Sequence, residues 1–174
     1  MLIAFGGLAG AGKDTAAKLT GLEVRHFMDP GRASLLALNP WVWDPHGIGY
    51  VALADLVKQL GWERAKRESH DVRGLLQRMG TEAGRSVHGE DCWVRLADLT
   101  GAAAFADTRF RNEVDAVWER GGNFVWVDRP GVEQLSHTSE RQLGPELADY
   151  VLRNDGTLED LAEEVKTMLE VLGL

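Results

Sequence analysis

The sequence has one cysteine, Cys92, and no run of apolar residues long enough to cross a membrane. A single cysteine excludes an intramolecular disulfide and a cysteine-based metal site. The first apolar run is too short for a secretory signal and leads directly into a glycine-rich loop, so we expect a cytoplasmic protein. We find no internal repeats in the sequence and expect no disordered tail.

The sequence has few basic residues: 19 Lys and Arg residues against 27 Asp and Glu residues give a formal net charge of −8. This balance argues against a general nucleic-acid-binding protein, although a phosphate site needs only local positive charge. Arginine greatly outnumbers lysine, which suits a phosphate-binding cleft and is explained equally well by a GC-rich genome. With 174 residues, the chain is long enough for one domain with a sizeable core.

The glycine-rich stretch between residues 7 and 15 is the most informative motif. The apolar run 2–5 precedes it as a predicted buried strand, and residues 16–19 follow it as a predicted helix. The pattern G-x-x-x-x-G-K in this setting is typical of a P-loop, whose backbone N–H groups cradle phosphate oxygens. Lys13 is expected to reach the β- and γ-phosphates. The residues that we expect to bind the nucleotide here are Gly10, Ala11, Gly12, Lys13, Asp14 and Thr15.

Asp14 occupies the position where a P-loop usually has Ser or Thr, and the hydroxyl follows one place later at Thr15. Carboxylate oxygens suit Mg²⁺, so we predict that Asp14 is a metal ligand. Two motifs of other nucleotide-binding classes are missing from the sequence. These are the Asn-Lys-x-Asp guanine motif and the acidic pair that closes an apolar strand in motor ATPases.

Four further apolar segments are predicted to be strands, over residues 24–27, 102–106, 123–127 and 150–153. Helical segments separate them, which predicts an α/β fold: a three-layer sandwich with a five-stranded parallel sheet and helices on both faces. Right-handed crossovers are expected. Residues 39–49 are predicted to form a loop, in which Trp41 or Trp43 either stacks on a base or covers a core edge. Helices are expected over 33–38, 50–60, 62–68, 71–87, 91–99 and 158–172 and in the segment that ends at 121–122.

Charged residues follow two of the predicted strands, at the carboxyl ends where parallel-sheet enzymes bind ligands. Asp29 and Arg32 follow the second strand, and Asp29 is also suited to cap the next helix. Asp107 is placed like a Walker-B aspartate, and Arg109 is placed to reach a transferred phosphoryl group. The alternative is that Asp107 or Thr108 only caps the helix that follows.

The predicted helix over 71–87 carries a polar series, Arg73, Gln77, Thr81 and Arg85, at four-residue spacing and so on one face. Two cations, an amide and a hydroxyl suit a phosphorylated substrate, and a solvated face with intrahelical pairs is the equal alternative. The polar loop 128–144 has the length of a functional segment. The candidate residues of this loop are Arg129, His137, Glu140 and Arg141.

Taken in order, these motifs resemble those of the deoxynucleoside monophosphate kinases of bacteriophages, a family of P-loop kinases. The resemblance extends over nearly the whole chain. Gly31 departs from it, because an apolar residue is expected there, and the lid has few arginines. The matching motifs are Gly-Lys-Asp-Thr at 12–15, Phe27-x-Asp29-Pro30-x-Arg32, Gln77-x-x-Gly80-Thr81-Glu82-x-Gly84-Arg85, Asp107-x-Arg109-Phe110-x-Asn112-Glu113, His137-x-Ser139-Glu140 and Asn154-Asp155-Gly156-Thr157.

The resemblance implies a single P-loop kinase domain over residues 1–174, with a helical acceptor-binding insertion near 30–99 and a lid near 128–144. It implies ATP and Mg²⁺ as cofactors and a deoxynucleoside monophosphate as the acceptor, in the host cytoplasm if the chain is phage-encoded. It assigns catalysis to Lys13, Asp107, Arg109 and Arg141, and further nucleotide contacts to Arg129, Asn154 and Gly156. It assigns the acceptor to Asp29, Arg32, Arg73, Gln77, Thr81, Arg85, His137 and Glu140.

Two other functions stay open on the sequence. One is a P-loop kinase for another small metabolite, similar to dephospho-coenzyme A kinase. The other is a non-catalytic nucleotide-binding switch. The bases that are accepted, the preference for deoxyribose or ribose, and the choice between a monomer and a homodimer are also open, whereas neither nucleic acid nor a membrane is expected as a partner.

Overall fold

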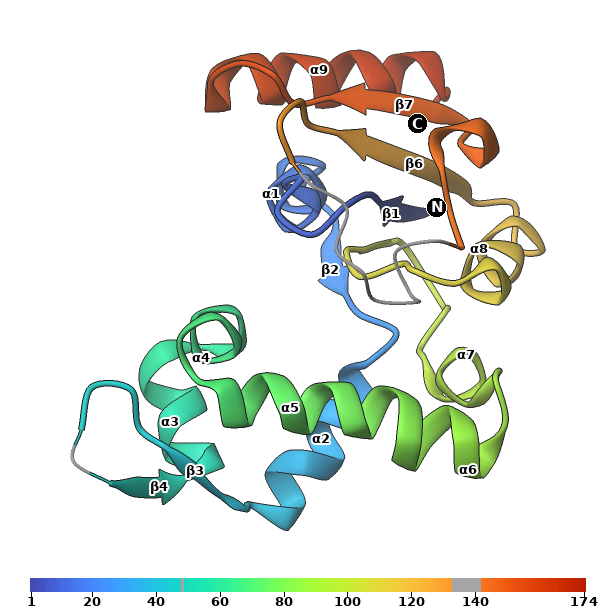
Figure 1. Ribbon diagram of the computed structural model, residues 1–174. Helices are drawn as coiled ribbons and strands as arrows, with labels where there is room; N and C mark the ends of the chain where they lie inside the picture. The colour runs from blue at the N-terminus through green and yellow to red at the C-terminus, as the bar shows by residue number, and fades with distance from the viewer. Residues whose placement is uncertain (48, 133–141) are drawn as a thin grey trace. The chain divides into compact units, whose positions relative to one another are not determined.

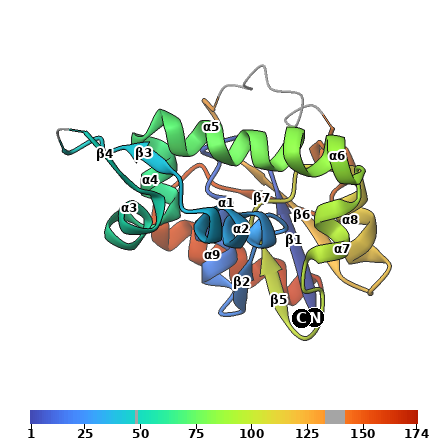
Figure 2. The same ribbon diagram turned by 90° about the horizontal axis from the view of Figure 1, so that it is seen from below.

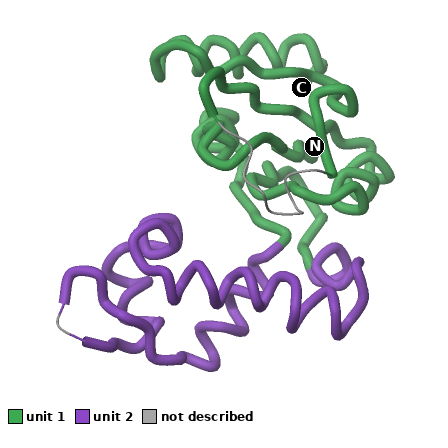
Figure 3. The backbone as a smooth tube through the Cα atoms, in the orientation of Figure 1, with its two compact units in different colours: residues 1–27, 97–174 green, residues 28–96 purple. Residues whose placement is uncertain are grey.

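The computed structural model describes residues 1–47, 49–132 and 142–174, and it divides into two compact units (Figures 1 and 3). Unit 1 comprises residues 1–27 and 97–174, and unit 2 comprises residues 28–96. Unit 2 corresponds closely to the range near 30–99 for which the sequence predicts an insertion. No helix among the described residues is long and apolar enough to span a membrane.

Unit 1 is built on a five-stranded parallel sheet with the strand order β2-β5-β1-β6-β7. The central strand β1 is buried along its whole length, as its uninterrupted apolar sequence predicts. The five-stranded parallel sheet predicted from the sequence is thus confirmed. The strands are β1 (Leu2–Gly6), β2 (Glu23–Arg25), β5 (Ala103–Phe105), β6 (Asn123–Asp128) and β7 (Tyr150–Arg153).

Helices cover both faces of this sheet. Helices α1 (Lys13–Leu19) and α9 (Leu158–Val171) pack on one face, and α8 (Arg111–Trp118) packs on the other against β1 and β6. Alternate residues of β1 point to opposite faces, so Ile3 and Phe5 join the core under α1 and α9. That core also contains Val125, Val127, Leu152, Leu161, Val165 and Met168.

Unit 2 is mainly helical and has a separate hydrophobic core. That core gathers Leu35, Val42, Leu53, Leu56, Ala65 and Val72. Figures 1 and 2 place a short hairpin at one end of α5, and α6 and α7 at the other. The elements are α2 (Asp29–Leu38), β3 (Trp41–Trp43), β4 (Tyr50–Ala52), α3 (Leu53–Leu60), α4 (Trp62–Glu68), α5 (His70–Arg78), the π-helical segment η1 (Met79–Arg85), α6 (Ser86–His88) and α7 (Cys92–Leu96).

The hairpin β3–β4 corrects the prediction of a loop over 39–49 and of a helix that begins at Tyr50. Val42 is buried between the exposed residues Trp41 and Trp43, which is the alternation of a strand with one face in the core. The rings of Trp43 and Tyr50 pack edge to face with their centroids 5.5 Å apart. Three residues per strand are too few to show a period in the sequence, and the prolines and glycines of the segment favour a loop.

Candidate functional site

The glycine-rich stretch between β1 and α1 forms a tight loop at the carboxyl end of the central strand. Gly7, Gly10 and Gly12 have φ angles of 143°, 87° and 100°, which residues with side chains rarely adopt. A Cβ atom on Gly7 would lie 2.5 Å from the carbonyl oxygen of Val127. Glycine is required at this position because the loop passes directly over the end of the neighbouring strand β6.

Lys13, the first residue of α1, is buried against this loop with 7% of its surface exposed. Its Nζ atom donates to the carbonyl oxygen of Gly7 at 2.7 Å and to that of Leu8 at 2.8 Å. Charge-assisted hydrogen bonds of this kind hold the ammonium group in one place. The positive charge is therefore fixed at the loop where a bound phosphate would need it.

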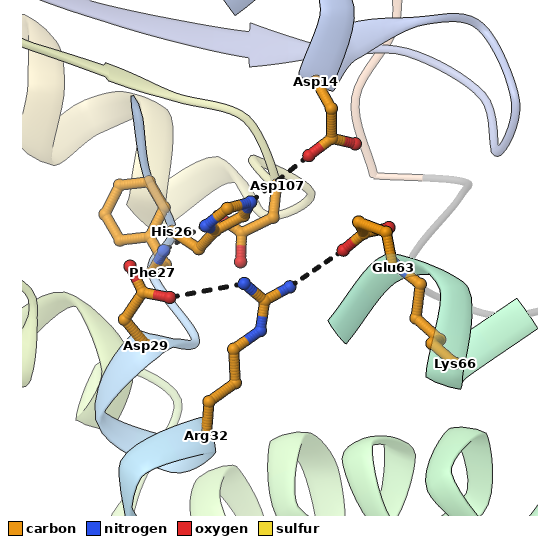
Figure 4. A network of polar contacts seen from close by, with 8 residues as sticks. All are labelled: Asp14, His26, Phe27, Asp29, Arg32, Glu63, Lys66 and Asp107. Carbon is orange, nitrogen blue, oxygen red and sulfur yellow. Dashed lines mark hydrogen bonds and ion pairs between the residues drawn. The ribbon is translucent and has the colours of Figure 1, made fainter. Parts of the chain in front are cut away.

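Asp14 lies in the first turn of α1, with 41% of its side chain exposed. Its Oδ1 atom lies 3.3 Å from Nε2 of His26, the residue that follows β2 (Figure 4). Thr15, which carries the hydroxyl of the motif, is exposed. A partly exposed carboxylate beside the loop fits Mg²⁺, which takes oxygen ligands and keeps several of its waters.

Asp107 lies two residues beyond the end of β5, at the carboxyl edge of the sheet. Its Oδ1 atom accepts a 2.8 Å hydrogen bond from the backbone N–H of Phe27 (Figure 4). The ring of Phe27 stacks on that of Phe105 with a centroid distance of 4.6 Å. These two contacts join the ends of the adjacent strands β2 and β5, so Asp107 orders the sheet edge at the position where a Walker-B aspartate is expected.

Glu113 holds the backbone of the segment that carries Arg109. The carboxylate of Glu113 is buried, and its Oε2 atom accepts from the N–H groups of Arg109 at 2.7 Å and Phe110 at 3.1 Å. These bonds make Glu113 a cap of α8, a role that the sequence interpretation offered to Asp107 or Thr108. Thr108 is buried, and its hydroxyl has no hydrogen-bond partner among the described residues.

Arg32 forms the centre of a charged cluster in unit 2. Its guanidinium lies 3.3 Å from Oδ1 of Asp29 and 3.2 Å from Oε1 of Glu63 in α4 (Figure 4). Lys66 pairs with the same Glu63 at 2.6 Å. The buried Nε atom of Arg32 has no hydrogen-bond partner in the part of the chain that the structure describes. A buried N–H group of this kind is suited to donate a hydrogen bond to an anionic ligand.

The predicted polar face of Arg73, Gln77, Thr81 and Arg85 is divided in the structure. The first three are exposed, whereas Arg85 is 5% exposed and donates through Nη1 to the carbonyl oxygen of Glu90. The division has a physical cause, because residues 79–85 form a π-helix rather than a continuation of α5. A π-helix has more residues in each turn, so a spacing of four no longer keeps side chains on one face.

Gly84 of this segment makes room for Trp93 of α7, and Gly80 accepts a hydrogen bond from it. The indole Nε1 of Trp93 donates at 2.8 Å to the carbonyl oxygen of Gly80. A Cβ atom on Gly84 would lie 2.3 Å from Cζ2 of the same ring. A Cβ atom on Gly31 would lie 3.0 Å from Cη2 of Trp93 and 2.6 Å from Cε of Met28, which explains why an apolar side chain is missing from that position.

The turn after β7 begins with Asn154, whose side chain is buried and donates through Nδ2 to the carbonyl oxygen of Ala11 at 2.7 Å. Gly156, in the same turn, is exposed. The turn ends at Thr157, the N-cap of α9, whose side chain and backbone N–H both donate to Asp160. The backbone N–H bond, followed by the hydroxyl bond, holds the pKa of the Asp160 carboxyl below its usual range.

A pocket of about 400 Å³ lies beside the loop in unit 1. Arg129 is one of its lining residues, is exposed and supplies a cation. Three predicted residues of the lid, His137, Glu140 and Arg141, lie outside the described residues. The pocket is lined by Leu8 and Ala11 of the loop, by 126–129 at the end of β6, and by 143–146, which include the 3₁₀ turn Pro145–Leu147 in part.

Four residues with structural consequences for the site were not among the predicted site residues: His26, Glu63, Trp93 and Glu113. A signal exists in the sequence for Glu113, because a glutamate three residues after a helix start is half of a capping box. The contacts of His26, Glu63 and Trp93 join different elements, and no local spacing pattern marks such contacts.

A glycine-rich loop that cradles a buried lysine, on the central strand of a parallel sheet with helices on both faces, defines the class of P-loop nucleotide-binding proteins. Comparison with known proteins narrows this class. A family model described as "Deoxynucleotide monophosphate kinase" matches residues 37–165.

Three viral relatives match over much of the chain. The deoxynucleotide monophosphate kinase of Enterobacteria phage T4 is 29% identical, covering 92% of this chain and 72% of the relative. The enzyme of the same name from Escherichia phage RB69 is 27% identical, covering 69% of this chain and 51% of the relative. A putative deoxynucleotide monophosphate kinase of Acanthamoeba polyphaga mimivirus is 26% identical, covering 95% of this chain and 94% of the relative. Among solved structures, shikimate kinase from Aquifex aeolicus aligns with a TM-score of 0.46 and 14% identity, covering 100% of this chain and 99% of that one.

The family model spans well over half of the chain, so the chain belongs to the deoxynucleotide monophosphate kinase family. The resemblance found in the sequence is thereby confirmed. The protein is a kinase.

Proposed function

We propose that this protein transfers the γ-phosphoryl group of ATP to a deoxynucleoside monophosphate and so produces the diphosphate. The observation that carries the proposal is the P-loop, in which Lys13 is buried and held at the loop by two carbonyl oxygens. The loop's glycine-rich backbone and Lys13 would bind the donor phosphates. Asp14 and Thr15 provide oxygen atoms for Mg²⁺, which would neutralise charge on those phosphates.

The acceptor is assigned to unit 2, with Arg32 as the strongest candidate for the acceptor phosphate. Its planar guanidinium already lies between two carboxylates and retains a buried Nε donor without a partner among the described residues. A phosphate dianion would compete with Glu63 for Arg32, and Lys66 would remain as the partner of the displaced carboxylate. Arg73, Gln77 and Thr81 are exposed on the neighbouring helix and remain candidates for sugar and base contacts.

The chemistry requires little proton transfer, because the acceptor phosphate is already ionised at neutral pH. Catalysis is therefore positioning combined with stabilisation of the charge that spreads over the transferring group. Lys13 would supply one fixed positive charge, and Arg109 would supply another from a backbone segment that Glu113 holds. Arg129 and Arg141 are the proposed lid cations, and closure of the lid over the donor would exclude water.

The test is release of ADP from ATP in the presence of a panel of acceptors. The panel contains the four common deoxynucleoside monophosphates, their ribose counterparts and dephospho-coenzyme A. We expect turnover that depends on a deoxynucleoside monophosphate. In Lys13→Ala this turnover should fall by at least roughly a hundredfold, the scale of losing one preorganised charge contact, whereas Lys166→Ala on the exposed side of α9 should leave it unchanged.

Three results would contradict the proposal. Turnover only with dephospho-coenzyme A would assign the chain to a different acceptor class. Stoichiometric binding of ATP without acceptor-dependent turnover would indicate a nucleotide-binding switch. Near-normal turnover in a folded Lys13→Ala protein would show that the loop is not the donor site.

A further inference from the structure

Asn154 connects three elements of unit 1 that are far apart in the sequence. It follows directly after β7 and is 9% exposed. Its Nδ2 atom donates to the carbonyl oxygen of Ala11 at 2.7 Å, and its backbone N–H donates to the carbonyl oxygen of Asp128 at 2.8 Å. One residue therefore holds both the P-loop and the end of β6, where the predicted lid begins.

The loop lies so close to Asn154 that only glycine fits at the contact. Gly12 has a φ angle of 100°, and a Cβ atom on it would lie 2.4 Å from Nδ2 of Asn154. The amide of Asn154 is thus packed directly against the Ala11–Gly12 peptide, one position before Lys13.

The hydrogen bond to Ala11 also sets the direction of the next N–H group. The Ala11–Gly12 peptide is trans, because the described chain has no cis peptide bond, and the C=O and N–H groups of a trans peptide point in opposite directions. When Asn154 holds the Ala11 carbonyl toward itself, the Gly12 N–H points away from Asn154. In a P-loop, the backbone N–H groups that face the nucleotide bind phosphate oxygens.

We infer that Asn154 is a positioning residue, which orients the Ala11–Gly12 peptide of the P-loop for the phosphates of the donor nucleotide. The inference rests on the proposed donor role of this loop. It replaces the interpretation in which Asn154 contacts adenine, because the side chain is buried and one of its two Nδ2 N–H groups is bonded to Ala11. The exposed residues Asp155 and Gly156 of the same turn remain placed for contact with a base.

The experiment compares a ligand that consists of phosphates alone with one that also has a base. Inorganic tripolyphosphate and ADP are titrated calorimetrically into the wild type, into Asn154→Leu and into Asn154→Ala. Leucine is close to asparagine in shape and removes the donor without adding charge, so the full chain is expected to fold, and alanine provides a second variant of smaller volume. Asp155→Ala, an exposed neighbour in the same turn, is the matched control.

The inference predicts that both Asn154 substitutions weaken the binding of ADP and of tripolyphosphate by the same factor, roughly tenfold. Without the Asn154 amide, the Ala11 carbonyl loses its buried hydrogen-bond partner, and the Ala11–Gly12 peptide is no longer held in one orientation. The KM for the acceptor should not change, and Asp155→Ala should bind tripolyphosphate like the wild type. Loss of ADP affinity with unchanged tripolyphosphate affinity would overturn the inference in favour of an adenine contact. Unchanged affinity for both ligands would overturn it as well. A wild-type protein that binds neither ligand would instead contradict the proposed donor site, and the inference with it.

Discussion

Replacing Gly84 by alanine should destabilise unit 2, although alanine is the better helix former. A Cβ atom at this position would lie 2.3 Å from Cζ2 of Trp93 and 2.7 Å from the carbonyl oxygen of Met79. The second contact is to backbone, so the helix itself must shift, and Trp93 must move away from its 2.8 Å hydrogen bond to Gly80.

The magnitude follows from three contributions. Overpacking of a well-filled site costs about 1–3 kcal/mol. Loss of the indole hydrogen bond costs about 1 kcal/mol more. The higher helix propensity of alanine stabilises the folded state by about 1 kcal/mol and offsets part of this cost. The net loss of unfolding free energy is therefore about 1–3 kcal/mol, or roughly 2–12 °C in melting temperature for a chain of this length.

Gly74 of α5 is the matched control in the same helical run. No atom lies within 4 Å of a Cβ atom added there, so Gly74→Ala should stabilise the protein by about 0.5–1 kcal/mol. Urea unfolding, followed by tryptophan fluorescence and circular dichroism, measures both variants as shifts in the midpoint at constant slope. A Gly84→Ala protein as stable as the wild type, or a Gly74→Ala protein destabilised to the same extent as Gly84→Ala, would refute the packing argument.

Two further predictions concern the donor site and the sheet edge. Asp14→Ala should raise the Mg²⁺ concentration required for half-maximal activity more than it raises the KM for ATP, since the proposed carboxylate ligand is lost. Identical Mg²⁺ midpoints in mutant and wild type would exclude a role in metal binding. Burial, and then the nearby charge of Glu164, raises the pKa of the Tyr150 phenol, which donates to Glu164 at 3.1 Å. The neutral phenol therefore stabilises the fold fully below the pKa of about 10 of a free tyrosine, and this contribution is lost as the pH rises through the higher folded pKa. In a Tyr50→Phe protein, Tyr150 is the remaining tyrosine, and absorbance titration should show that its pKa lies above that of a free phenol. Glu164→Gln should lower this pKa. A pKa equal to that of a free phenol would contradict the prediction.

The parts of the fold that were predictable are those with a local pattern in the sequence. Each of three segments carries its own periodicity or spacing: the strand 2–5, the loop that follows it, and the helix predicted over 158–172 with its apolar face. Patterns of this kind allowed the parallel sheet to be predicted. Lys13 and Asp14 were assigned to the loop for the same reason, because their position follows from the motif alone.

Other features depend on contacts between elements that are distant in the sequence. The hairpin β3–β4 is too short for a period, and it is stabilised partly by Asp71, which accepts from the N–H of Trp43 at 2.8 Å across 28 positions. The π-helical turn that separates Arg85 from Arg73 arises where Trp93 packs on Gly84, and a spacing rule for α-helices cannot anticipate it. The contact of Asn154 with Ala11 spans 143 positions, so the sequence suggested its turn but not its partner.

The separate cores of the two units have a consequence for how this kinase can diversify. Unit 2 is a single uninterrupted segment, residues 28–96, inserted between two adjacent parallel strands of unit 1, and it closes its own hydrophobic core around Val42, Leu56 and Val72. The core beneath the P-loop is built from residues of unit 1 alone, so substitutions in the core of unit 2 remove none of its side chains. Substitutions confined to residues 28–96 can therefore vary the core and the exposed polar residues of unit 2 while every side chain of the core beneath the P-loop is kept.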